Sequence, residues 1–247
     1  MHILGVIPAR MAATRFPGKP LVDLAGRSLV QWVYESAAAC TDLDAVVVAT
    51  PDEEIAAAVA AFGGVAELTR EDHPTGTDRV SEVAARHAEA DVVVNVQGDQ
   101  PFVTSEMLSA LVGPYRRGEA PVMTTVAAPL DEGHGFDDPN VVKVVCDRNG
   151  DALYFSRSPI PYRRDVVEER LPVFHHIGLY AFTRSFLSLY AGLDPTPLER
   201  TEALEQLRAL EHGYRIRVCP IDRPVIEVNT PDDLARAVAL VERGGVA

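Results

Sequence analysis

The sequence predicts an α/β fold with a mostly parallel, Rossmann-like sheet, helices on both faces and an antiparallel arm in the second half. In the first half, short aliphatic runs alternate with helical patterns, as in strand–helix–strand units. After about residue 120 the runs become strand-like pieces joined by longer loops. No repeat or low-complexity linker interrupts the 247 residues, so we expect one domain over residues 1–247 with an insertion at about residues 120–195.

The elements of the first half follow from hydrophobic periodicity and capping signals. Residues 3–8 form a buried strand, and residues 29–37 carry a helical apolar stripe. A strand over residues 45–49 leads to a helix that we expect Thr50 to cap and Gly63 to end. The remaining elements expected here are a strand at residues 65–68, a helix from about 78 to 90 and a strand at 91–96.

The second half contains shorter strand-like runs and a final helix. Thr230, Pro231 and Asp233 supply an N-cap, a first-turn proline and a third-position acid for that helix. The strands expected are at residues 122–127, 141–146, 152–155, 177–182, 214–219 and 225–228.

Composition excludes several classes of function. The chain carries 36 acidic and 23 basic residues, a net charge of −13, which argues against nucleic acid or an anionic membrane as the main partner. No apolar run approaches the ~20 residues of a membrane span. Cys40, Cys146 and Cys219 lie far apart, so we expect reduced thiols. Because the chain opens directly into a strand without a signal segment, we expect a cytoplasmic protein.

A cationic loop follows the first strand. The first 22 residues contain no acidic side chain, yet Arg10, Arg15 and Lys19 fall within ten residues punctuated by Gly and Pro. A loop at the end of the first strand of an α/β sheet is a common place for an anion to bind. This pattern favours a polyanionic ligand such as a nucleoside triphosphate; the alternative is a solvated surface loop.

Two further loops follow predicted strands. Asp99 comes just after the strand at residues 91–96. There its carboxylate, together with phosphate oxygens, could hold Mg²⁺. The alternative is a structural turn, because Gly-Asp is common in turns. The loop at residues 73–79 offers main-chain donors and hydroxyls that suit a base or ribose. Its alternative role is structural, with Thr77 capping the next helix.

The second half adds polar side chains beside apolar strands. Adjacent His175 and His176 point to opposite faces of a strand, which argues against a metal site formed by both. Each histidine on its own is more typical of a structural hydrogen-bonding residue.

Together, these motifs resemble the 3-deoxy-manno-octulosonate cytidylyltransferases, also called CMP-KDO synthetases. The N-terminal loop alone indicates only the wider nucleotidyltransferase superfamily, whereas the second-half segments are specific. The matching segments run in order almost from end to end: residues 7–10, 14–15, 17–21, 75–79, 94–99, 139–145, 152–157, 176–180, 197–199, 204–208 and 230–234.

The resemblance implies a nucleotidyltransferase fold, a homodimer formed through the second-half arm, and Mg²⁺ as cofactor. In the implied reaction the anomeric hydroxyl of a 3-deoxy-2-ulosonic acid attacks the α-phosphate of CTP and releases pyrophosphate. Arg10, Lys19 and Asp99 are the implied catalytic residues, with Arg15 as a helper. The other implied residues are Ala9, Thr77, Arg79 and Gln97 for the nucleotide and Arg157, His176, Tyr180, Glu205 and Gln206 for the sugar acid.

Three departures from the family pattern bear on the metal and the substrate. Gln100 replaces a usual Glu, His175 a frequent Arg, and Asn229 the Asp before Thr-Pro. We expect Asp99 and Asn229 to bind the metal, with a raised Mg²⁺ requirement because one charge is missing; the alternative for Asn229 is an Asx-type turn.

Two rival functions stay open at this stage. One is another nucleotidyltransferase, such as a CMP-sialate synthetase or a methylerythritol-phosphate cytidylyltransferase. The other is a non-catalytic nucleotide-binding protein that kept the fold. The sequence does not identify the acceptor, and an 8-amino analogue of the eight-carbon acid fits the same reasoning.

Overall fold

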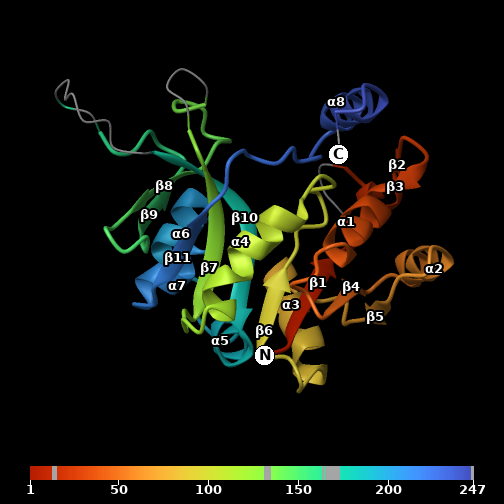
Figure 1. Ribbon diagram of the computed structural model, residues 1–247, viewed down its shortest axis with the longest axis horizontal. Helices are drawn as coiled ribbons and strands as arrows, with labels where there is room; N and C mark the ends of the chain where they lie inside the picture. The colour runs from red at the N-terminus through yellow and green to blue at the C-terminus, as the bar shows by residue number, and fades with distance from the viewer. Residues whose placement is uncertain (13–15, 131–134, 163, 165–172, 246–247) are drawn as a thin grey trace. The chain divides into compact units, whose positions relative to one another are not determined.

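The structure is a computed structural model that describes residues 1–12, 16–130, 135–162, 164 and 173–245 (Figure 1). The chain forms two compact units. Unit 1 combines Met1–Ser109 with Val225–Ala247, and unit 2 is Ala110–Pro224. Our expectation of a single domain with an insertion stays a prediction.

Unit 1 is built on a parallel sheet, as the alternating pattern predicted. Strand β1 (Ile3–Pro8) pairs in parallel with β6 on one side and with β4 on the other. Strand β5 extends the sheet by pairing in parallel with β4. The strands are almost entirely aliphatic, and five of the six residues of β1 are buried. The other strands of this sheet are β4 (Ala45–Thr50), β5 (Ala66–Leu68) and β6 (Val92–Asn95).

Helices pack around this sheet. Helix α1 (Leu29–Ala38) starts at Ser28, whose hydroxyl accepts a hydrogen bond from the Gln31 amide. Helices α1 and α3 both contact β1 and β4. Helix α8 buries Ala237 in a small apolar cluster with Leu24 and Leu29. The remaining elements are η1 (Lys19–Leu21), β2 (Asp23–Leu24), β3 (Arg27–Ser28), α2 (Glu53–Ala61), α3 (Gly76–Arg86) and α8 (Pro231–Glu242), with α4 (Ser105–Arg116) at the unit boundary.

Unit 2 contains the predicted antiparallel arm. Strand β7 lies between β11, its parallel neighbour, and β10, its antiparallel neighbour. Strands β8 and β9 form an antiparallel pair that joins β10 through β8. The elements are β7 (Met123–Pro129), β8 (Lys143–Cys146), β9 (Ala152–Ser156), β10 (Phe174–Thr183), β11 (Ile216–Pro220), α5 (Arg184–Tyr190), α6 (Pro197–Glu202) and α7 (Leu207–Glu211).

Two local predictions are wrong. Residues 225–228 are not a strand, because this segment runs beside the loop after β6 and donates one main-chain hydrogen bond there, from Val228 to the Asp99 carbonyl (2.8 Å). Thr50 ends β4 instead of capping α2, and the N-cap is Asp52. The Asp52 carboxylate makes no cap bond because it accepts from the Met11 amide (2.8 Å). The expected elements at residues 3–8, 29–37, 45–49 and 65–68 are confirmed within a residue or two.

Helix length bears on one further expectation. None of the described helices is long and apolar enough to cross a membrane.

Candidate functional site

A cavity of about 350 Å³ opens in unit 1 at the carboxyl end of β1. Residues of the cationic loop, the loop before α3, the loop after β6 and the segment before α8 line it. Among them are Ala9, Arg10, Lys19, Arg79, Gln97 and Asp99, all expected from the sequence. Asn229 also lines the cavity. The chain therefore brings most of the expected nucleotide and metal residues to one place, whereas Arg15 lies outside the described residues.

The cationic loop is fixed at both ends. Ala9 donates to the Ala49 carbonyl (2.9 Å), and Met11 is held by Asp52 from the neighbouring strand–helix connection. Gly18 accepts the left-handed conformation (φ 72°) that starts the short helix η1. Lys19 then projects across the cavity, with its Nζ 3.0 Å from Oδ2 of Asp99. Both side chains stay partly accessible, at 17% and 25%, so a ligand can reach them.

The loop before α3 is held by its own helix cap. Thr75 is the N-cap: its hydroxyl accepts from the Asp78 amide, and the Asp78 carboxylate accepts from the Thr75 amide. The structural alternative that we gave to Thr77 is therefore wrong. Thr77 is buried, and its hydroxyl accepts a hydrogen bond from Nδ2 of Asn95 in β6 (3.1 Å). Thr75 therefore caps α3, and Thr77 connects α3 to strand β6 of the sheet.

Arg79 lines the cavity but is almost fully buried, and its guanidinium is hydrogen-bonded to the loop ahead of α3. Nη1 of Arg79 donates to the Thr69 hydroxyl and also to the Arg70 carbonyl, the latter at 2.9 Å. Burial, and then the positive charge of Arg10, lower the pKa of Arg79. Two cations near one another gain stabilisation from an anion placed between them.

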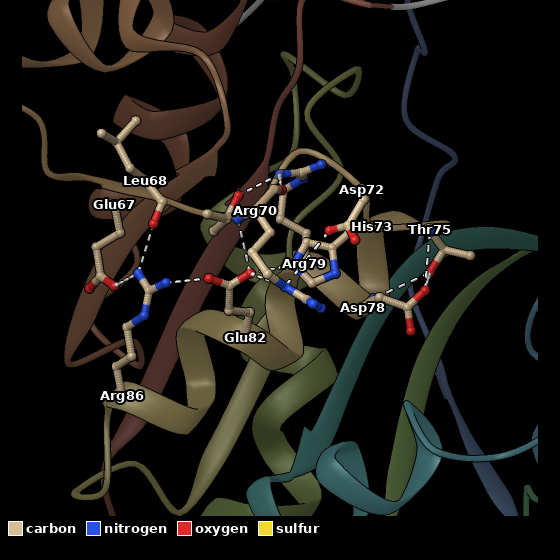
Figure 2. A network of polar contacts seen from close by, with 11 residues as sticks. Glu67, Leu68, Arg70, Asp72, His73, Thr75, Asp78, Arg79, Glu82 and Arg86 are labelled. Carbon is tan, nitrogen blue, oxygen red and sulfur yellow. Dashed lines mark hydrogen bonds and ion pairs between the residues drawn. The ribbon is translucent and has the colours of Figure 1, made fainter.

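Glu82 organises this loop from below, as Figure 2 shows. Its carboxylate accepts from the Arg70 amide (3.1 Å) and contacts the side chains of His73 and Arg86. Although partial burial opposes ionisation, the bonds to His73 and Arg70 and the charge of Arg86 lower the pKa of Glu82. The sequence interpretation missed this network, because a Glu about two turns beyond the N-cap residue Thr75 is ordinary on a helix surface.

The loop after β6 approaches the end of β1 very closely. A Cβ atom on Gly98 would lie 2.8 Å from the Pro8 carbonyl oxygen, which explains why a glycine stands there. Gln97 and Asp99 on either side line the cavity. The Asp99 carbonyl accepts a hydrogen bond from the Val228 amide. This bond connects the end of the cavity at Asp99, here called the acidic end, to the segment before α8.

A second carboxylate, Glu227, was not expected; it lies beside this acidic end, bonded to Asn229 of the cavity lining. Gln100 donates to its Oε1 (3.1 Å) and Asn229 to its Oε2 (3.0 Å). Glu227 as a whole residue is exposed, but protein atoms partly enclose its carboxylate. This loss of solvation, and then the negative charge of Asp99, raise the pKa of Glu227. An acidic residue inside the apolar run at residues 225–228 could have indicated a functional carboxylate, but we interpreted the run as a strand.

The residues at this end suit a hard cation. Within the described ranges, no group of three or more His, Cys, Asp and Glu side chains is placed to hold a metal. Mg²⁺ in nucleotide sites needs only one or two carboxylates, because phosphate oxygens and water supply the rest. Gln100 is 1% exposed, and its Oε1 has no hydrogen-bond partner among the described residues, which fits a site whose oxygen ligands are completed on binding.

The expected sugar-acid residues belong to unit 2. Arg157 donates from Nε to the Glu202 carbonyl (2.7 Å), from Nη1 to the Pro139 carbonyl (2.9 Å) and from Nη2 to the Ala203 carbonyl (3.4 Å). Since arginine has five N–H donors, these three bonds leave two without a partner among the described residues. Its carbonyl is held by Lys143, a fully buried lysine that the sequence interpretation missed.

A buried polar cluster lies on β10 and α7. His176 packs edge-on against Phe155 and hydrogen-bonds through Nε2 to the Thr125 hydroxyl (3.0 Å). Burial, and then the neighbouring His175, lower the pKa of His176 to about 3, so its imidazole is neutral. Tyr180 donates to Oε1 of Gln206 (3.0 Å). Nε2 of Gln206 is buried with no partner in the part of the chain that the structure describes, which leaves its two N–H donors for a ligand.

Glu205 flanks this cluster. Its carbonyl accepts from the Tyr190 hydroxyl (2.7 Å). Below it, Arg208 and Glu199 form a buried ion pair with two nitrogen–oxygen contacts of 2.6 and 3.0 Å. This pair joins α6 to α7, the helix whose N-cap is Gln206.

Comparison with known proteins agrees with these features. The profile of the Cytidylyltransferase family matches residues 4–216. The chain is 57% identical over 244 residues, 99% of both chains, to the 3-deoxy-manno-octulosonate cytidylyltransferase of Acaryochloris marina. It is 59% identical, over 97% of this chain and 98% of the relative, to that of Synechococcus elongatus, and 48% identical, over 96% and 98%, to that of Geobacter sulfurreducens.

Solved structures give the same result. The chain is similar to a CMP:2-keto-3-deoxy-manno-octonic acid synthetase complexed with CTP, with a TM-score of 0.93, 39% identity and coverage of 99% of this chain and 100% of that one. A 4-diphosphocytidyl-2C-methyl-D-erythritol synthase from Anaerococcus prevotii shares the fold at a TM-score of 0.64 and 14% identity, over 98% and 99% of the two chains. With identity near 60% over almost its full length, the chain belongs to the 3-deoxy-manno-octulosonate cytidylyltransferase family.

Proposed function

We propose that this protein transfers CMP from CTP to the anomeric hydroxyl of 3-deoxy-manno-octulosonate or a close analogue. In this reaction the sugar oxygen forms a bond to the α-phosphorus, the bond from that phosphorus to the bridging oxygen breaks, and pyrophosphate leaves. The hydroxyl proton passes to solvent. The observation that carries the proposal is the contact of Lys19 with Asp99 across a cavity that Arg10 and Arg79 also line.

The cationic wall of the cavity would bind the triphosphate. Arg10 and Lys19 would neutralise its oxygens and the charge that develops on the leaving pyrophosphate, and Arg15 would help. Reactions of this kind depend on positioning and electrostatic stabilisation, and they need no protein nucleophile. The nucleoside would bind between the two loops at the sheet edge, through Ala9, Thr77, Arg79 and Gln97.

The sugar acid would bind through the polar residues of unit 2. Arg157, with two N–H donors left, suits a carboxylate, which a planar guanidinium binds in bidentate fashion. Gln206 offers a buried amide donor and Tyr180 its hydroxyl to sugar oxygens. His176 and Glu205 complete the proposed set. Pairing of two chains as a homodimer through the arm stays a prediction.

Mg²⁺ is the proposed cofactor, held by Asp99 and by the amide oxygen of Asn229. Bound there, it would withdraw charge from the phosphate oxygens and so assist departure of pyrophosphate. Asn229 donates its Nδ2 to Glu227, which leaves its Oδ1 as the atom suited to a cation.

The test is a pyrophosphate-release assay with CTP and Mg²⁺ against a panel of sugar acids. The panel should contain 3-deoxy-manno-octulosonate, its 8-amino analogue and a sialic acid, with ATP and GTP replacing CTP in parallel. We expect release with CTP and an eight-carbon acid and much slower release with the other nucleotides. Pyrophosphate released with none of the acids, or no CTP binding in calorimetry with metal present, would overturn the proposal.

A further inference from the structure

Glu227 is an acid placed where the neighbouring sequence is apolar. Its segment is fixed beside the loop after β6 by the hydrogen bond from Val228 to the Asp99 carbonyl (2.8 Å). Asn229, the next residue, lines the cavity together with Asp99, and its side chain donates to Glu227, which places this acid beside the cavity. Two carboxylates thus share one small region, and only Asp99 has a cation, Lys19, as a salt-bridge partner within the described ranges.

Two amides hold the Glu227 carboxylate in place. Nε2 of Gln100 donates to one oxygen at 3.1 Å, and Nδ2 of Asn229 donates to the other at 3.0 Å. Each oxygen retains a lone pair for a further ligand, because a carboxylate oxygen accepts more than one bond. Amide donors fix the orientation of the carboxylate without cancelling its charge. A cationic partner, by contrast, would leave less negative charge to bind a metal.

The Gln100 amide supplies an independent indication of a ligand. Its nitrogen is committed to Glu227, so its Oε1 must face elsewhere, and this buried atom has no partner among the described residues. A buried acceptor without a partner costs about 1–3 kcal/mol. A cation or one of its bound waters would satisfy this oxygen, and hard cations accept amide oxygens readily.

We infer that Glu227 is the second carboxylate ligand of the divalent cation at Asp99, oriented by the amides of Gln100 and Asn229. This inference rests on the proposed function and adds to it the source of the second negative charge. Positions 100 and 229 both carry neutral amides, and the acid between them in space is Glu227. The cation site would therefore contain two carboxylates, and the expectation of a raised Mg²⁺ requirement no longer follows.

The inference is tested by titrating the protein with Mn²⁺ alone and following free Mn²⁺ by electron paramagnetic resonance, with Mg²⁺ as competitor. We expect Glu227→Gln to weaken Mn²⁺ binding at least about tenfold, because the number of charged ligands sets the affinity. Asp232→Asn is the matched control: it removes one carboxylate from an exposed position in the first turn of α8 and should leave the affinity unchanged.

A compensating variant makes the test independent of general damage. In Glu227→Gln/Asn229→Asp the carboxylate moves two residues along the chain, and we expect most of the lost Mn²⁺ affinity to return. No Mn²⁺ binding by the wild-type protein, equal affinity in Glu227→Gln, or no recovery in the double variant would overturn the inference. Failure of the proposed function appears in a different assay, as absence of pyrophosphate release with every acid, and leaves the Mn²⁺ titration interpretable.

Discussion

Lys19 and Asp99, 80 residues apart in the sequence, meet with 3.0 Å between Nζ and Oδ2. The lysine follows the left-handed Gly18 at the start of η1, and the aspartate follows the close approach of Gly98 to the end of β1. The turn at Gly18 thus positions the positive charge of Lys19, and the close approach at Gly98 positions the negative charge of Asp99. Since both side chains are partly accessible, the pair adds little to stability, and its value lies in the site.

Lys19→Ala should lower the turnover number roughly a hundredfold or more, the scale of losing one electrostatic contact to the transition state. Asp99→Asn should do the same. We expect the far-ultraviolet circular dichroism and the unfolding midpoint of both variants to stay near wild type, because neither side chain is in the core. Pyrophosphate release under saturating CTP checks the prediction. Turnover within a few-fold of wild type in either variant contradicts the assigned role.

Gly98→Ala should reduce the free energy of unfolding by about 1–3 kcal/mol, because the new Cβ would lie 2.8 Å from the Pro8 carbonyl oxygen and main chain must move. Gly76→Ala is the matched control beside the same proline. Its Cβ would lie 3.4 Å from Cγ of Pro8, an ordinary contact, so we expect stability to be unchanged or slightly higher. Urea unfolding of the two variants decides the matter, and equal stabilities would refute the steric explanation.

Arg157→Lys keeps the charge but loses the planar fork that serves three main-chain carbonyls and leaves two donors. We expect the KM for the sugar acid to rise at least about tenfold while the KM for CTP changes less than a few-fold. Arg200→Lys is a matched control, because Arg200 also binds main-chain carbonyls in unit 2 but has no proposed ligand. A larger effect on CTP than on the sugar acid would show that Arg157 has another role.

His176 makes stability depend on pH. Its pKa is lowered from 6.5 to about 3 in the folded protein, so between these values the unfolded chain binds a proton that the folded one does not. Stability from this residue is therefore present above pH ~6.5 and decreases on acidification by up to about 1.4 kcal/mol per pH unit. We expect His176→Gln to show a smaller loss than wild type between pH 7 and pH 5 in urea unfolding. The exposed His212, changed to Gln, should retain the wild-type dependence.

The sheet of unit 1 could be predicted because its strands are continuous aliphatic runs bounded by capping residues. The end of the chain could not, because residues 225–228 have the composition of a strand but bond to the loop at Asp99. Local patterns do not reveal which main-chain groups are already paired elsewhere. The same limit applies to the wrong N-cap at Thr50. Thr50 belongs to β4, and the carboxylate of the actual N-cap, Asp52, accepts its hydrogen bond from Met11, 41 residues away.

The site was predictable where charge is concentrated along the chain. Arg10, Lys19 and Asp99 stand out in the sequence and line one cavity. Glu227 and Glu82 were missed because their importance comes from partners distant in sequence: Gln100 lies 127 residues from Glu227. Their roles depend on folded geometry that composition and spacing do not contain.

The cavity of unit 1 takes its walls from segments that are synthesised at very different times. The cationic loop is made first and Asp99 later, while Asn229 follows only after all of unit 2. Chains begin to fold from the N-terminal end during translation. A nascent chain or a fragment that stops before residue 225 therefore lacks Asn229, and with it the neighbouring Glu227. It can place Lys19 beside Asp99, but the lining of the cavity is complete only once the last segment of the chain has been made.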